Sequence, residues 1–171
     1  EWDPPRPRPG QRVRIRVADL EVKVGDQPEL HYLTDPWAPT DHVLPLDPEG
    51  EVWVTDLTVP ENAVAVFFYA LPRREGPQPL QYGAYLTTRK HLKRYIHSFS
   101  IYGENGLPLR AASHTQAVMA ERQERRPEEI LACVDREIAL YPDLFPAYQT
   151  RWQTLLKTEG RSPEALAKVH S

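Results

Sequence analysis

The sequence predicts a mainly β protein with helices after it: a sandwich of about seven strands, then a short antiparallel helical segment. Two observations indicate the strands. Apolar residues alternate at period two in several short runs before residue 112, and 18 of the 171 residues are prolines, about twice the usual share, which favours loops and short strands. The third observation is that from about Ser113 apolar residues recur at helical spacing. We expect a Pro-rich tether at 1–10, the sandwich at 11–112 and a helical hairpin region at 113–171.

The first predicted strands are half-buried. Val13, Ile15 and Val17 alternate with arginines, which predicts one buried and one solvated face. A turn at 25–28 leads into a second strand at 29–34. The stretch 35–50 is rich in proline, so we expect a long loop with a short edge strand around 42–46.

The segment 51–70 is the predicted centre of the sandwich, with two adjacent strands joined by a turn at 60–62. The second strand, 63–69, is apolar on both faces and therefore needs cover on both sides. One or two further strands follow at 84–88 and 93–102, and Asn105-Gly106 predicts a turn with positive backbone dihedrals. About seven short strands in about 100 residues are typical of an immunoglobulin-like (Ig-like) sandwich.

The remainder of the chain predicts helices. A segment rich in Ala, Glu, Arg and Gln runs to Arg125, and Pro127 suits the first residue of a new helix. Gly160 predicts the end of the next helix, and Ser162 caps a last short one. Two apolar stripes are expected, formed by Ile130, Val134, Ile138 and Tyr141 in one helix, and by Phe145, Tyr148, Trp152 and Leu155 in the next.

Two stretches carry a family resemblance. GENGLPLRAASHTQAV, residues 103–118, is similar to the sandwich-to-helix junction upstream of the catalytic domain in bacterial envelope thioredoxin-like thiol-disulfide oxidoreductases. PEEILACVDREIALYPDLFPAYQTRWQTLLK, residues 127–157, resembles the tetratricopeptide-like helices that follow that junction. The resemblance implies a non-catalytic N-terminal region of a periplasmic, cell-envelope or secreted protein, with a membrane tether upstream of Glu1 as one option.

In that family a thioredoxin domain with a CxxC nucleophile would follow, so we expect the protein to continue past Ser171. No redox residue can be assigned within this chain, because Cys133 is its only cysteine. Cys133 falls inside a predicted helix next to an apolar stripe, without a paired base in the sequence. We interpret Cys133 as structural.

Several classes of function are not indicated. Six histidines show no HxH, HExxH or i, i+4 pair, and the oxygen-rich residues of the loop around Asp35, Asp41, His42 and Asp47 lack a regular calcium ladder, so no metal or cofactor is expected. The net charge of −3 gives no general case for nucleic acid. The basic run from Arg89 to Arg94 is expected to face solvent. No run of 18 apolar residues predicts a transmembrane helix.

We therefore expect a non-catalytic interaction or scaffold module that positions a downstream domain or docks a partner protein. The expected contact residues are Phe145, Tyr148 and Trp152. An alternative is a carbohydrate-binding module that uses Trp37 with Tyr82 or Tyr85. A third alternative, a hydrolase, would require a polar cleft in which His and Asp side chains converge.

Overall fold

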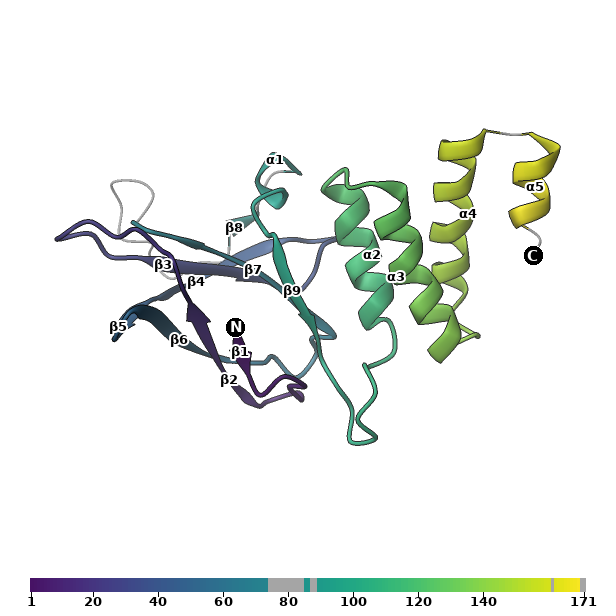
Figure 1. The fold of residues 1–171 in the computed structure, drawn as a ribbon. Coiled ribbons are helices and arrows are strands. Elements are labelled where there is room, and N and C mark those ends of the chain that lie inside the picture. Colours follow the sequence, from purple (N-terminus) through teal and green to yellow (C-terminus); the bar gives the residue numbers. More distant parts are fainter. Residues whose placement is uncertain (74–84, 87–88, 161, 170–171) are drawn as a thin grey trace.

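The computed structural model describes residues 1–73, 85–86, 89–160 and 162–169. In these residues all paired strands are antiparallel and form two sheets, and helices follow them, which confirms the predicted combination of β-structure and helices (Figure 1). The first sheet has the order β1 (Trp2–Asp3), β2 (Arg12–Val17), β6 (Val52–Thr58), β5 (Asp47–Glu49). The second has the order β8 (Tyr85–Leu86), β4 (Thr40–Pro45), β3 (Glu29–Leu33), β7 (Ala65–Leu71), β9 (His97–Ser100). The helices are α1 (Arg89–Leu92), α2 (Ala112–Arg122), α3 (Pro127–Leu140), α4 (Phe145–Glu159) and α5 (Pro163–Val169).

The main hydrophobic core lies between the two sheets. Val13 and Ile15 of β2 are fully buried there, as the alternation of β2 predicts. The arginines of β2 point away from the core, and Arg12 and Arg14 pair with Asp56 of the neighbouring strand β6. These exposed ion pairs add little stability, so burial of the alternate apolar residues holds β2 in place.

Strand β7 is buried on both faces, as predicted for the central segment. Val66 and Phe68 belong to the core between the sheets. Phe67 and Tyr69 point to the other side, where they form a second core with Met119 of α2. In Figure 1, α2 is the long helix nearest the sheets. The helices therefore supply part of the cover that a two-sided apolar strand needs.

Residues 1–10 are part of the folded structure and not a tether, which corrects the prediction. Strand β1 pairs with β2, with Trp2 opposite Ile15. The indole ring of Trp2 lies 5.3 Å from the ring of Phe99 and 6.0 Å from that of Phe68. The sequence pattern did not predict this strand because the stretch is rich in proline. Packing of the half-buried Trp2 indole accounts for the position of the strand.

Two predicted strands have different bounds from those expected. Strand β4 pairs with both β3 and β8 and is therefore not an edge strand, while Pro48 lies in the edge strand β5. A missing N–H is tolerated at an edge. The predicted strand 93–102 is shortened to β9, because Leu92 and Tyr95 both turn into the second core at the spacing of a helical turn. Of the predicted strand 84–88, the structure describes only β8.

The four later helices lie side by side in a row that leads away from the sheets (Figure 1). Pro127 is the first residue of α3 and Gly160 follows α4 with φ 71°, as predicted. Helix α3 buries Ile130 and Val134, but Glu137 completes its buried stripe in place of Ile138. None of the helices among the described residues is both long and apolar enough to cross a membrane.

Candidate functional site

The three aromatic residues predicted as a partner contact lie together on one side of α4. We call Phe145, Tyr148 and Trp152 the α4 aromatic face. The ring of Trp152 lies 5.9 Å from that of Phe145, edge to face, and 6.3 Å from that of Tyr148. Phe145 remains 57% exposed. Leu155, which the sequence places on the same stripe, is instead buried.

Local contacts fix this surface. The Tyr148 hydroxyl donates a hydrogen bond to the carbonyl of Pro142, 2.9 Å away, just before the helix begins. On its opposite side α4 buries small and medium residues, among them Ala147 and Thr150. The aromatic rings are therefore held in contact with one another, while the opposite side of α4 packs in the protein interior. Such a preorganised aromatic cluster can bind a protein surface at low entropic cost.

Of the three residues predicted for glycan binding, the structure describes the side chain of Trp37 only. Tyr82 lies outside the described residues, and of Tyr85 only the backbone is described, where it pairs with Asp41. Trp37 is 51% exposed, as expected, in a turn whose Asp35 carboxylate accepts from the Trp37 and Ala38 amides. The Trp37 ring lies beside His114 of α2, 5.9 Å away, so its described neighbours are in the helical region.

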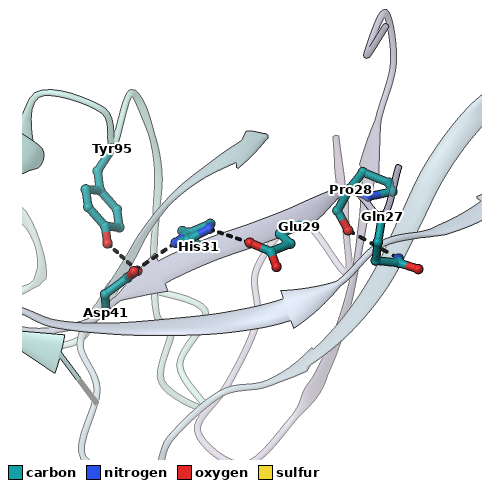
Figure 2. A network of polar contacts seen from close by, with 6 residues as sticks. All are labelled: Gln27, Pro28, Glu29, His31, Asp41 and Tyr95. Carbon is teal, nitrogen blue, oxygen red and sulfur yellow. Dashed lines mark hydrogen bonds and ion pairs between the residues drawn. The ribbon is translucent and has the colours of Figure 1, made fainter. Parts of the chain in front are cut away.

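A buried polar network that the sequence did not predict lies on the outer face of the second sheet (Figure 2). His31 Nδ1 lies 2.8 Å from Asp41 Oδ2, and His31 Nε2 lies 3.1 Å from Glu29 Oε2. The Tyr95 hydroxyl donates to the other oxygen of Asp41. Glu29, His31 and Tyr95 are each at most 5% exposed. The ring of Tyr69 stacks on His31 at 4.9 Å.

Two opposing effects act on the protonation of His31. Burial lowers the pKa of the imidazole, but hydrogen bonds and charges from Asp41 and Glu29 raise the pKa by more, so it lies above its ordinary value. Burial, followed by the hydrogen bond to Asp41, also raises the pKa of Tyr95, which keeps its hydroxyl protonated as a donor. The network therefore favours the protonated form of the His31 imidazole between two carboxyl groups.

This arrangement does not support the hydrolase alternative, although a histidine and an aspartate do converge. Both ring nitrogens of His31 face carboxylate oxygens, so neither is left to take a proton from a nucleophile. The signal in the sequence was Glu29 and His31 at spacing two on one strand, which gives both the same face. Asp41 could not be assigned without the pairing of β3 and β4.

A second buried carboxylate joins two helices. Glu137 of α3 is 1% exposed, and its Oε1 accepts from the His114 amide in the first turn of α2, 3.0 Å away. Helix α2 has no capping side chain of its own. Glu137 thus satisfies one of the unpaired N–H groups of α2 and places negative charge at its positive end.

The remaining candidates lie apart from one another. Cys133 is partly buried, and its Sγ lies 3.3 Å from Arg136 Nη2. Lys93 of the predicted basic run pairs with Glu124 at an exposed position. Of the acidic loop, Asp41 turns to His31, whereas Asp47 is exposed on β5. Among the described residues no group of three His, Cys, Asp or Glu side chains could hold a metal ion.

Comparison of the chain with protein-family models, with curated proteins and with solved structures found no match.

Proposed function

We propose that the chain is a non-catalytic interaction module in which an Ig-like sandwich and tetratricopeptide-like helices present a docking surface. The strand order supports the first part. Four strands in the order β1-β2-β6-β5 and four in the order β4-β3-β7-β9 follow the ABED and C′CFG arrangement of Ig-like sandwiches. The row of consecutively packed helices α2, α3 and α4 supports the second part.

The observation that carries the proposal is the α4 aromatic face, in which Phe145 is exposed and Tyr148 and Trp152 are half-buried. Aromatic residues are enriched at the centres of protein interfaces, where they bury much area at a small loss of side-chain entropy. Helix α4 itself is held in place by packing against α2, α3 and α5. Leaving Phe145 more than half exposed costs hydrophobic free energy, which a docked partner would recover.

The family resemblance extends this proposal to the protein as a whole. In this extended proposal the module stands upstream of a thioredoxin-like domain in the periplasm or cell envelope and positions that domain or docks its partner. The α4 aromatic face lies on the last long helix, which α5 follows in the described part of the chain. The module itself supplies contacts and no redox chemistry.

Site-specific photocrosslinking tests the docking surface. A benzophenone side chain is introduced at Phe145, and as a matched control at Val24, which is fully exposed in the β-region. We expect a discrete crosslinked protein from position 145 and not from position 24. The product should disappear in the Tyr148→Ala, Trp152→Ala double variant. Equal labelling from both positions, or a product that survives the double variant, would argue against the docking role of α4.

A further inference from the structure

A polar groove separates the Trp37 turn from helices α2 and α4, on different residues from the α4 aromatic face. The groove has a volume of about 640 Å³ and is open to solvent on one side. Its principal lining residues are Trp37, His114, Glu121, Arg122, Gln149 and Gln153. Gln149 and Gln153 stand one helical turn apart on α4, so both amides face the same space.

His114 of α2 is one of the residues that line this groove. His114 is only 6% exposed, and its Nε2 lies 3.0 Å from Thr150 Oγ1. Thr150 donates its own proton to the Pro146 carbonyl, so it accepts from His114 and the ring proton sits on Nε2. Nδ1 is then an acceptor for which the described residues provide no donor. Burial lowers the pKa of His114 and keeps the ring neutral.

The other lining groups narrow the class of ligand. The Trp37 ring is tilted 45° from the His114 ring, so the two are not stacked face to face and the half-exposed indole can receive a ligand ring. Glu121 and Arg122 bring opposite charges to the lining and Glu121 is already paired with Lys157, so the lining has no excess charge that would select a charged ligand. Glutamine amides donate and accept together, as a row of hydroxyl groups requires.

We propose that this groove binds a neutral saccharide, with a pyranose ring stacked on Trp37 and one hydroxyl donating to Nδ1 of His114. The site goes beyond the protein-docking function, because it uses the junction of the β-region and the helices and leaves the α4 aromatic face free. It also replaces the tyrosines of the sequence-based glycan hypothesis with polar side chains from α2 and α4.

Titration calorimetry with chitohexaose, cellohexaose and maltohexaose, each at about 1 mM, tests the site. We expect at least one of them to bind, with affinity reduced about tenfold in Trp37→Ala and also reduced in the Gln149→Ala, Gln153→Ala double variant. Both glutamines are exposed, so the double variant should fold normally. Val24→Ala, at an exposed position away from the groove, is the control and should bind as the wild type does.

Two results would overturn the proposal. One is the absence of binding for all three oligosaccharides. The other is binding that Trp37→Ala and the glutamine double variant leave unchanged. Because Trp152 belongs to the docking surface and Trp37 to the groove, failure of the saccharide site is distinguishable from failure of the protein-docking surface.

Discussion

His31 and Asp41 meet across two strands: Nδ1 of the imidazole lies 2.8 Å from Oδ2 of the carboxylate on the face of the second sheet that carries the second core. His31 pairs directly with Val43, so Asp41, two residues earlier, is its diagonal neighbour on the same face. Glu29 approaches the other ring nitrogen from within β3. The charged cluster thus links β3, β4 and, through Tyr95, the segment before β9.

The raised pKa of His31 predicts a specific pH dependence. Because the folded pKa exceeds the unfolded value, the stabilisation is complete below about pH 6.5 and is lost as the pH rises through the folded pKa. In urea unfolding at pH 6 and pH 9, His31 should therefore lower the unfolding free energy at pH 9, against the opposite contribution of His97 and His114, whose pKa values lie below the ordinary value. His31→Gln should remove the contribution of His31. An equal difference between pH 6 and pH 9 in both proteins would contradict the account.

Removal of Asp41 from the network should destabilise the fold. Asp41→Asn removes the charge that His31 and Tyr95 share and leaves Glu29 as the carboxylate partner of His31, and breaking a buried charge cluster in this way costs about 3 kcal/mol. Asp47→Asn, at an exposed position of β5, is the control and should change the unfolding free energy by less than about 0.5 kcal/mol. Equal effects at both positions would show that the network contributes nothing.

The cap that Glu137 provides to α2 predicts a graded pair of variants. Glu137→Ala removes the acceptor from the His114 amide and should cost about 2 kcal/mol, whereas Glu137→Gln keeps an acceptor oxygen and should cost less. Hydrogen exchange of the His114 amide reports the bond directly. Exchange as slow in Glu137→Ala as in the wild type would disprove the cap.

Trp2 should anchor the N-terminal residues. Trp2→Ala removes an indole packed on Phe68 and Phe99 and should lower the unfolding free energy by about 2 to 3 kcal/mol. Arg8→Ala, at an exposed position of the same stretch, should be close to neutral. If Trp2→Ala were also neutral in thermal denaturation, residues 1–10 would behave as a tether after all.

The two-sided burial of β7 predicts that the β-region depends on the helices. A fragment of residues 1–112 lacks Met119 and the Gln123 amide, which donates to the carbonyls of Leu92 and Tyr95. Its second core would then be exposed, and we expect the fragment to aggregate in size-exclusion chromatography. A monomeric, folded fragment would show that the β-region is a separate domain.

The local parts of the fold could be predicted from the sequence, because each depends on neighbours in the chain. The alternation of β2, the double burial of β7, the positive φ at Gly106 and the start of α3 at Pro127 are of this kind. Residues that act across elements could not be predicted. The contacts of Trp2, Asp41 and Glu137 each depend on which strand or helix packs beside them. The local pattern of residues along the sequence does not reveal this packing.

The two candidate surfaces differ in the same respect, because one is built from neighbouring residues of the chain and the other from distant ones. The spacing of Phe145, Tyr148 and Trp152 places them on neighbouring turns of one helix, and their rings are indeed in contact. The groove beside Trp37 combines a turn after β3 with two helices more than 70 residues further along the chain, so only its tryptophan could be singled out from the sequence.

The most direct test of the proposed docking role is the dissociation constant of the protein captured by crosslinking at position 145. We predict that Trp152→Ala weakens its binding to the module at least about tenfold, because a central aromatic residue of an interface is lost, while Val24→Ala leaves the constant unchanged. Equal dissociation constants for the wild type and Trp152→Ala would contradict the claim that the α4 aromatic face is the docking surface.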